Sequence, residues 1–435
     1  MSTAAHAASV KARPPRYSSA RSERSWTLWL INSLLAGVER TGLFRVRLDV
    51  DRLQREVRQE VGLDWRDRHY EEPMRVMANA INNEADMHPA GRFMMILGVK
   101  LFLKNRLLLE QAWQNQPEAM AMPVRRPLYV IGLPRTGTTL LYNLLCQDPN
   151  CRPLMGWESF FPVPEPALRG RKQPPDVRRQ EGDELVARVN RMAPRLKSVH
   201  ELVSDGPEEC TWLLNNTFLS PGMVLQAKVL SYLEYLKSQP RAAWQRAYTD
   251  YANSLKLLQH NSPGTHWVLK SPAHQMGLGP LLDVIPQACV VQTHRDVTKV
   301  IGSCCSLFSV VRGIYSDKVC EETLGPEVVD HLRFATARAM EARSERPAQI
   351  FDVGFEHLVK DPIGTVRRIY ERFGYEYDPR MEAGMVQWLR DNPQGKHGSH
   401  KYDLAQFGLT EQHVRDAFAD YQSLCDEILR PTSPN

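Results

Sequence analysis

The sequence has few of the features that mark metal proteins, disulfide frameworks and membrane spans. Its 435 residues include eight scattered cysteines, with one adjacent pair at Cys304 and Cys305 and no C-x-x-C pair. We therefore expect reduced thiols, no bound metal and a cytoplasmic location. The apolar stretch at residues 26–37 is too short to cross a bilayer, which takes about twenty residues, and no cleavage site clearly follows it. An amphipathic helix is expected there, and no transmembrane segment.

A strong charge of either sign is also missing. The formal net charge is +5, so the chain lacks the basic excess of a nucleic-acid binder, although a mild basic balance suits an anionic ligand. Hydrophobic residues make up 43% of the chain, which is enough to fill a core. Composition alone indicates a soluble enzyme without nucleic-acid partners, and it leaves the oligomeric state open.

The most informative segment is a glycine-containing turn between an apolar run and a helical pattern. Residues 128–132 are typical of a buried strand, residues 133–137 of a turn, and four leucines then recur at helical spacing, at positions 140, 141, 144 and 145. Backbone N–H groups and a helix N-terminus at such a junction favour an anion. The pattern predicts a phosphate-binding loop.

This loop departs from the Walker pattern of metal-dependent NTPases. Gly132 and Gly137 have the Walker spacing, but Thr138 and Thr139 occupy the positions of its lysine and its Ser/Thr. The cation lies earlier, at Arg135, whose planar guanidinium suits phosphate or sulfate oxygens. An ordinary magnesium-dependent NTPase is therefore disfavoured.

Residues 134–139, Pro-Arg-Thr-Gly-Thr-Thr, resemble the 5′-phosphosulfate loop of sulfotransferases, most closely those of the tyrosylprotein and bacterial branches. These enzymes use 3′-phosphoadenosine 5′-phosphosulfate (PAPS) and release 3′,5′-adenosine bisphosphate. The resemblance extends in ordered patches over roughly residues 125–410. It implies that the 5′-phosphosulfate is held by Arg135, Thr136, Gly137, Thr138 and Thr139.

A second patch matches the family's 3′-phosphate site. Residues 288–293 are typical of a buried strand, and Asp296 is a plausible N-cap for the helix that follows. Arg295 and Ser303 are eight positions apart, as are the family's Arg and Ser that hold the 3′-phosphate. The resemblance implies the same role for both residues.

A third patch precedes it. Residues 267–270 resemble a strand that ends at a Lys-x-Pro sequence, as in tyrosylprotein sulfotransferases. The resemblance implies that Lys270 lies near the leaving oxygen and stabilises the charge that develops there. By itself, a lysine that ends an edge strand would explain the same residues.

The base for the acceptor hydroxyl has three candidates. Glu158 ranks first, because tyrosylprotein and heparan sulfotransferases use a Glu about twenty residues beyond the loop, and Glu158 follows Arg135 by twenty-three. Its aromatic neighbours would desolvate the carboxyl and raise its pKa toward that of a general base. A solvated loop carboxylate is the alternative. His200 ranks second, and His274, four residues after Lys270, ranks third.

The last patch is a glycine-rich basic loop at residues 391–402. Lys396 is the candidate phosphate ligand there, with Lys401 also in reach. The segment departs from the pattern of the animal cytosolic enzymes, so a solvated basic loop fits it equally.

The predicted organisation has three parts: a disordered tail (1–25), a helical extension (26–122), and an α/β domain (123–435) with a helical acceptor-side insertion at about 150–265. Strands are expected at 128–132, 267–270, 288–293 and 349–353, and a helix begins at Asp361-Pro362 and ends at Gly374. Strands that alternate with helices imply a parallel sheet covered on both faces, a P-loop-like three-layer α/β fold.

The acceptor is less defined. An aromatic set could line an apolar pocket or belong to the plain core, namely Trp157, Phe160, Phe161, Trp212 and Phe218. The set favours a small-molecule or lipid-like hydroxyl acceptor, whether a hydroxylated lipid, sterol-like or phenolic, and a carbohydrate or carrier-bound acceptor stays open. Two rival functions are a P-loop nucleotide kinase or NTPase and an inactive nucleotide-binding scaffold.

Overall fold

The computed structural model describes residues 26–42, 46–163, 177–194, 202–260, 262, 264–393 and 403–430. The predicted N-terminal tail, His200, and nearly all of the basic loop with Lys396 and Lys401 lie outside the described residues. The predictions for these segments therefore stay predictions.

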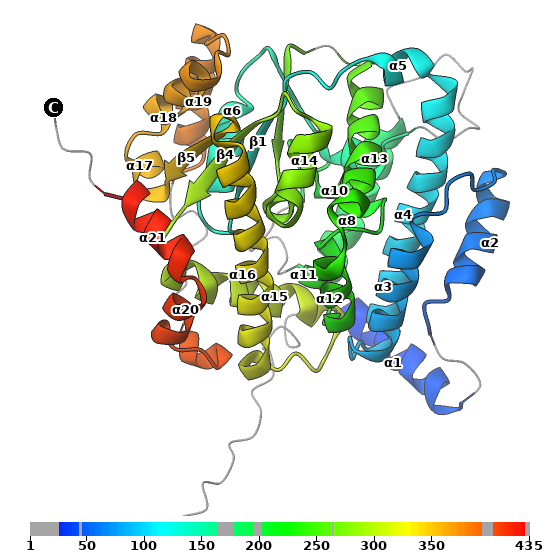
Figure 1. Ribbon diagram of the computed structural model, residues 1–435. Helices are drawn as coiled ribbons and strands as arrows, with labels where there is room; N and C mark the ends of the chain where they lie inside the picture. The colour runs from blue at the N-terminus through cyan, green and yellow to red at the C-terminus, as the bar shows by residue number, and fades with distance from the viewer. Residues whose placement is uncertain are drawn as a thin grey trace, which may run out of the picture.

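A parallel five-stranded sheet forms the centre of the molecule (Figure 1). Its order is β2-β3-β1-β4-β5, and every neighbouring pair is parallel. The strands are β1 (Leu128–Gly132), β2 (Cys151–Pro153), β3 (His266–Lys270), β4 (Cys289–His294) and β5 (Ile350–Gly354). The four predicted strands are confirmed, and β2 was missed because Cys-Arg-Pro has no apolar strand pattern.

Alternation along the strands sends side chains to two different cores. Leu128 and Val130 belong to the core under α6 (Thr138–Leu145), α18 (Pro362–Phe373) and α19 (Pro379–Asp391). Tyr129 and Ile131 belong to the core under α14 (Leu278–Val284), α15 (Val297–Tyr315) and α16 (Glu321–Glu345). Helices thus cover both faces, which confirms the predicted three-layer α/β fold (Figure 1).

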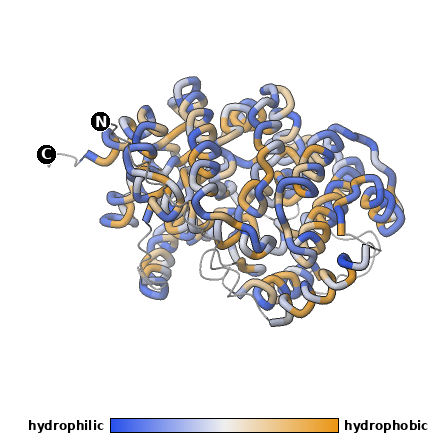
Figure 2. The backbone as a smooth tube through the Cα atoms, turned by 90° about the horizontal axis from the view of Figure 1, so that it is seen from below, coloured by the Kyte–Doolittle hydropathy of each residue, from blue (hydrophilic) through white to orange (hydrophobic). Residues whose placement is uncertain are grey.

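Local signals set the helix ends where the sequence predicted them. The Asp296 side chain accepts a hydrogen bond from Thr298 N–H at the start of α15. Asp361 caps α18 in the same way, and Gly374 ends that helix in the left-handed conformation. Along most helices hydrophilic and hydrophobic residues alternate, as amphipathic helices around a core require (Figure 2).

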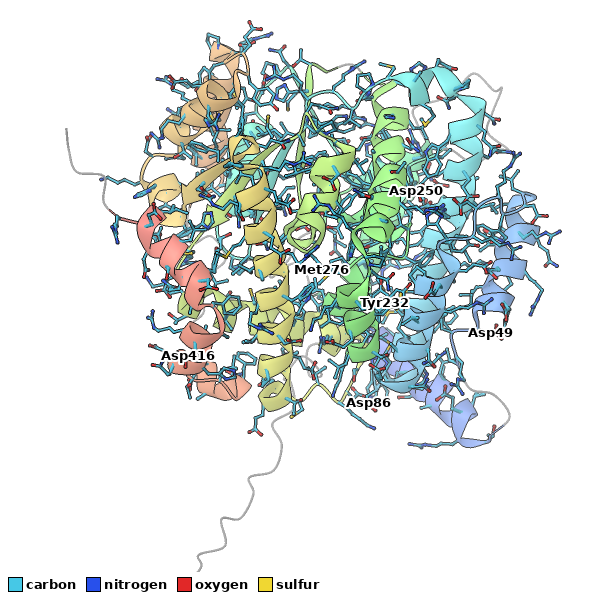
Figure 3. The ribbon with its side chains drawn as sticks, viewed as in Figure 1. Asp49, Asp86, Tyr232, Asp250, Met276 and Asp416 are labelled. Carbon is cyan, nitrogen blue, oxygen red and sulfur yellow. The ribbon has the colours of Figure 1, made fainter. Side chains whose placement is uncertain are left out.

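The helices before β1 share a core with the domain that follows. They are α1 (Trp26–Arg40), α2 (Val50–Val61), α3 (Glu71–Asn83), α4 (Pro89–Asn115) and α5 (Pro117–Ala121). One continuous cluster contains Leu53 and Leu103 of this extension together with Tyr129 and Leu269 of the sheet. Met276 and Tyr232 lie in the interior of this view, whereas Asp49, Asp86 and Asp416 are exposed (Figure 3).

The described residues of the long connection between β2 and β3 are mainly helical. Its described helices are α7 (Gly156–Phe160), α8 (Val177–Met192), α10 (Thr211–Asn215), α11 (Gly222–Gln226), α12 (Leu230–Ser238) and α13 (Arg241–His260). A 3₁₀ helix at Pro272–Gly277 follows β3, a second at Leu404–Phe407 follows α19, and α20 (Glu411–Ala417) and α21 (Ala419–Ile428) close the described chain. Two further short helices flank β5, at Pro347–Gln349 and α17 (Phe355–Lys360).

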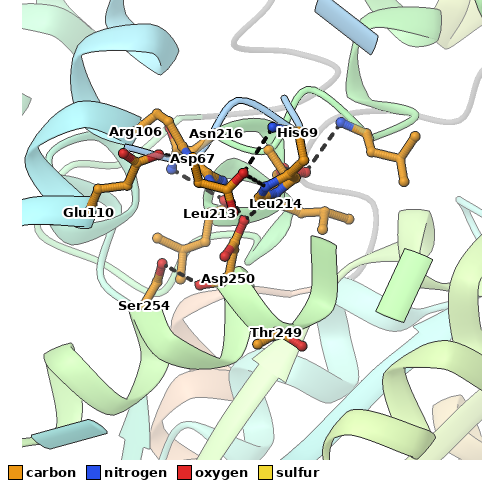
Figure 4. A network of polar contacts seen from close by, with 12 residues as sticks. Asp67, His69, Arg106, Glu110, Leu213, Leu214, Asn216, Thr249, Asp250 and Ser254 are labelled. Carbon is orange, nitrogen blue, oxygen red and sulfur yellow. Dashed lines mark hydrogen bonds and ion pairs between the residues drawn. The ribbon is translucent and has the colours of Figure 1, made fainter. Parts of the chain in front are cut away.

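A buried polar network joins the extension to α13 (Figure 4). The Arg106 guanidinium on α4 contacts Glu110 at 2.7 Å and also Asp250 on α13. His69 Nε2 lies 2.8 Å from the same Asp250, and His69 Nδ1 lies 2.8 Å from Asp67. The charges thus bridge two parts of the chain that are far apart in sequence.

Among the described residues, α15 alone is long and apolar enough to cross a membrane. Its apolar window is 72% buried inside the protein, as in the core helix of a globular domain.

Candidate functional site

The loop after β1 is held in a conformation that its residue types permit. Gly132 has φ 140°, and a Cβ at this position would lie 2.4 Å from Thr293 Oγ1. Gly137, the N-cap of α6, has φ 92°. Arg135 also has a positive φ, 73°, and its residue is exposed. The strained turn presents Arg135 and the first turn of α6 to an anion.

The three threonines of the loop differ in exposure. Thr136 is fully buried: its hydroxyl donates to Leu133 O at 2.7 Å and lies 2.5 Å from Thr293 Oγ1 on β4. A contact between Thr136 and a ligand would therefore run through its backbone. Thr138 is buried and Thr139 is exposed at the start of α6.

Arg295 reaches the same loop from the end of β4. Its guanidinium donates to Arg135 O at 3.2 Å and stacks on Phe355, with Cζ 4.2 Å from the ring centre. Burial lowers the pKa of Arg295 from its ordinary value, and the nearby Arg135 adds to this effect. Within the described residues, Arg295 Nε is a buried donor without a hydrogen-bond partner. An anion bound here would accept a hydrogen bond from the Arg295 Nε–H group.

Ser303 lies on α15 in its second turn and is buried. The adjacent Cys304 donates to Pro134 O at 3.6 Å, which ties this turn of α15 to the loop. The helix that carries Ser303 therefore packs against the same loop that Arg295 contacts.

Lys270 ends β3 and forms an ion pair that the sequence analysis did not predict. Its Nζ lies 2.6 Å from Glu209 Oε1, and the Glu209 side chain is 22% exposed. Lys270 Nζ also lies 6.0 Å from the ring centre of Tyr142 on α6. The parallel register pairs Lys270 with Val130, two residues before the loop glycine at the end of β1. The pair thus lies beside the phosphate-binding loop.

The segment before α10 carries Glu209 to this position. Gly156 and Trp157 donate their backbone N–H groups to Gly206 O and Ser204 O, both at 2.9 Å, so residues 204–206 pack along α7. Cys210 then donates to Lys270 O at 3.1 Å. The acidic pair in the polar break at 200–210 was the available signal, but only the fold shows that it meets Lys270.

Glu158 has a partner that the sequence analysis did not anticipate. Its carboxylate receives both terminal nitrogens of Arg152, at 2.6 and 2.8 Å, and the N–H of Met155 at 3.2 Å. The side chain is 5% exposed, and the Arg152 guanidinium stacks 4.7 Å from the ring centre of Trp267. Its role as base stays a prediction, in competition with this structural role.

His274 is fully buried next to Cys210 Sγ and Tyr248 OH, each 3.1 Å from one ring nitrogen. Burial lowers the pKa of His274 to about 3, so the ring is neutral near pH 7 and closed off from solvent. These surroundings are those of a structural histidine.

Two of the five candidate acceptor aromatics, Phe160 and Trp212, are in contact. Phe102, from the N-terminal helical extension, also packs against Trp212. Trp212 on α10 lies 5.0 Å from Phe160 and 6.0 Å from Phe102 on α4, between ring centres. Trp157 instead packs under Arg178 and Arg179. Phe218 is buried in the main core, and Phe161 follows α7. Trp212 is partly exposed and lies three residues from Glu209.

The comparisons with known proteins agree with this arrangement. The profile of the sulfotransferase family matches residues 127–379. The structure of sulfotransferase STF1 from Mycobacterium tuberculosis H37Rv superposes with a TM-score of 0.74 at 30% identity, over 87% of this chain and all of that one. Sulfotransferase STF9 from Mycobacterium avium gives 0.77 at 27% identity, over 88% and 97% of the two chains.

A curated relative has a more specific name. Omega-hydroxy-beta-dihydromenaquinone-9 sulfotransferase Stf3 of Mycobacterium bovis is 25% identical over 296 residues, which is 66% of this chain and 72% of that protein. The same enzyme of Mycobacterium tuberculosis matches equally. With the family profile over more than half of its length, and a sheet and loop of the matching fold, this chain belongs to the sulfotransferase family.

Proposed function

We propose that this sulfotransferase takes the sulfuryl group from PAPS and transfers it to the hydroxyl of a lipid-like acceptor. The observation that carries the proposal is the convergence of three groups at one edge of the sheet. They are the loop at 133–139, Arg295 with its unpaired Nε, and the Lys270–Glu209 pair. Magnesium-dependent kinases place a lysine where this loop has Thr138.

Donor binding uses the loop and Arg295. We assign the 5′-phosphosulfate to Arg135, Thr138, Thr139 and the backbone of residues 136–137, and the 3′-phosphate to Arg295 and Ser303. The unpaired Nε of Arg295 supports this role, because a buried donor gains a hydrogen bond when a phosphate oxygen arrives. Phe355 holds the guanidinium plane in place. Lys396 stays a prediction.

In the transfer, the acceptor oxygen attacks sulfur while the bond from sulfur to the 5′-phosphate oxygen breaks. Negative charge grows on that phosphate oxygen, and Lys270 stabilises it. Positioning and charge stabilisation carry such reactions, as in phosphoryl transfer. The acceptor proton must pass to a carboxylate within about 2.6–3.2 Å of the hydroxyl.

We propose Glu209 as that carboxylate, ahead of Glu158. Glu209 is partly exposed beside Lys270, whereas Glu158 is almost fully buried and already accepts hydrogen bonds from Arg152 and Met155. A base must reach the acceptor hydroxyl, and the partial exposure of the Glu209 side chain favours it. Glu158 instead orders the start of α7, against which the segment before Glu209 packs.

The proposed acceptor is a hydroxyl-bearing lipid-like molecule. The partly exposed Trp212, with Phe160 and Phe102, offers an apolar surface a few residues from Glu209. The name of the curated relative, omega-hydroxy-beta-dihydromenaquinone-9 sulfotransferase, supports the same class. The cytoplasmic location stays a prediction, and the particular acceptor is open.

Transfer of ³⁵S from labelled PAPS tests the proposal. The purified enzyme is incubated with a total lipid extract, with a panel of sugars and with simple phenols, and the products are separated by chromatography. We expect label in the lipid fraction, abolished in Lys270→Met. Label from [γ-³²P]ATP in place of ³⁵S would support the kinase rival. Bisphosphate binding without turnover of any acceptor class would support the scaffold rival.

A further inference from the structure

The outward face of α1 is apolar although it faces solvent. Trp26, Trp29 and Leu34 are 73%, 66% and 63% exposed, and three further large apolar residues of the helix are exposed, namely Leu30, Ile31 and Val38. Scattered apolar side chains are normal on a protein surface, but a contiguous set on one helix indicates a binding surface.

The inward side of the same helix carries two polar side chains, those of Asn32 and Glu39. Glu39 forms an ion pair with Arg92 on α4 and accepts a hydrogen bond from Val46 N–H at 2.9 Å. Asn32 accepts from Ala90 N–H at 3.3 Å. Leu28 is the one fully buried apolar residue of α1. Most large apolar side chains of α1 thus face solvent, whereas a surface helix in water usually buries its apolar face.

Periodicity makes the outward residues a continuous stripe. Trp26, Leu30, Leu34 and Val38 are four residues apart, so they lie one above another on the helix. Phe93 and Leu97, also four apart, are exposed on α4, against which α1 packs. The helix has 15 residues, or roughly 22 Å at 1.5 Å per residue, which is too short to span a bilayer.

The charged residues of the neighbouring sequence indicate what binds to this apolar stripe. Residues 1–25 contain five basic residues and one acidic residue, namely Lys11, Arg13, Arg16, Arg21, Arg24 and Glu23. Glu39, the one acidic residue of α1, is turned inward, and Arg40 is exposed. Basic residues beside a Trp-containing apolar face suit an anionic lipid surface, where Trp side chains favour the headgroup level.

We propose that α1 lies in the headgroup region of an anionic lipid bilayer, with the Trp26–Val38 stripe inserted and the basic charge of the N-terminal sequence favouring anionic lipids. This partner goes beyond the proposed reaction and involves neither the donor site nor the acceptor site. The protein would bind the membrane surface without crossing it.

Vesicle flotation with the full-length protein tests the proposal. We expect wild type to float with phosphatidylcholine vesicles that contain phosphatidylglycerol, and much less with phosphatidylcholine alone or at high salt. Trp29→Glu and Leu34→Glu should each weaken binding about tenfold or more, since each removes one inserted side chain. Leu230→Glu, at an exposed leucine on α12, should bind as wild type does.

The triple variant Lys11→Gln, Arg13→Gln, Arg16→Gln tests the electrostatic attraction to anionic lipids separately. It should lose the preference for phosphatidylglycerol and the salt dependence. Unchanged melting temperature and bisphosphate affinity in all variants would show that the fold and donor site are intact. The proposal is overturned if wild type floats with neither vesicle, or if the α1 variants float as wild type does. It is also overturned if sedimentation shows a dimer that Trp29→Glu dissociates, because the stripe would then bind a second copy.

Discussion

Glu209 Oε1 lies 2.6 Å from Lys270 Nζ, so a partly exposed carboxylate and a buried ammonium meet at the carboxyl end of β3. They come from segments sixty-one residues apart. The pair neutralises Lys270 in the free protein and holds a proton acceptor beside the position we assign to the leaving oxygen. An acid–base group and an electrostatic group are thus oriented before substrates bind.

The assignment of the base predicts different results at two glutamates. Glu209→Gln should lower kcat by roughly 10²–10⁴ with bisphosphate affinity nearly unchanged, since it removes a proton acceptor and keeps the side-chain shape. Glu158→Gln should instead lower stability by about 3–5 kcal/mol, because it leaves Arg152 buried without its counter-charge. Steady-state kinetics and denaturant unfolding of both variants distinguish which glutamate is the base. A stable Glu158→Gln enzyme without turnover, beside an active Glu209→Gln enzyme, would return the base to Glu158.

The loop conformation predicts a contrast between two glycines. Gly132→Ala should destabilise the protein by about 1–3 kcal/mol and weaken donor binding, because its φ is positive and its Cβ would meet Thr293. Gly98→Ala on α4 has open space around its Cβ and should stabilise the protein by about 0.5–1 kcal/mol. Urea titration measures both. Equal effects at the two positions would mean that the loop is not strained.

The buried network on Arg106 predicts a large loss of stability. Arg106→Met leaves Glu110 and Asp250 without their buried cation and should cost about 3–5 kcal/mol. Arg52→Met breaks an exposed pair with Glu56 and should cost far less, because solvent screens such a pair. The two unfolding curves can be compared directly. If Arg106→Met is as stable as Arg52→Met, the network does not hold the extension to α13.

Protonation of the buried His274 should destabilise the protein as the pH falls. Burial lowers its pKa to about 3 in the folded protein, from an ordinary value of 6.5. Its neutral form therefore stabilises the fold fully above pH 6.5, and this contribution is lost as the pH falls toward 3. Between pH 7.5 and 5.5 the loss should be about 1.4 kcal/mol.

Urea unfolding of wild type and His274→Gln at both pH values isolates this contribution. The loss on acidification should be smaller in the variant by the amount that His274 contributes. Other buried histidines with lowered pKa values, such as His331 and His294, titrate in both proteins and cancel in the difference. An identical pH slope in the two proteins would mean that His274 is accessible to protons.

The sequence predicted the local parts of this fold and not the pairings between distant ones. Apolar runs gave four of five strands, and Asp296 and Asp361 set their helix starts, because these signals act within a few residues. The Lys270–Glu209 contact depends on how residues 202–209 approach the end of β3. The Arg152–Glu158 pair joins residues only six apart, but it depends on β2, which the sequence did not predict. Glu209 was therefore missed, and the partner of Glu158 was not foreseen.

Calorimetric titration with 3′,5′-adenosine bisphosphate and with ATP·Mg²⁺, in wild type and in Arg295→Ala, tests PAPS as the donor. We predict a clear preference for the bisphosphate that falls by about tenfold or more in Arg295→Ala, the loss expected for one charge-assisted phosphate contact. Arg338→Ala, at a partly exposed arginine on α16, serves as the control and should bind as wild type does. Equal or tighter binding of ATP·Mg²⁺, indifferent to Arg295, would contradict PAPS as the donor.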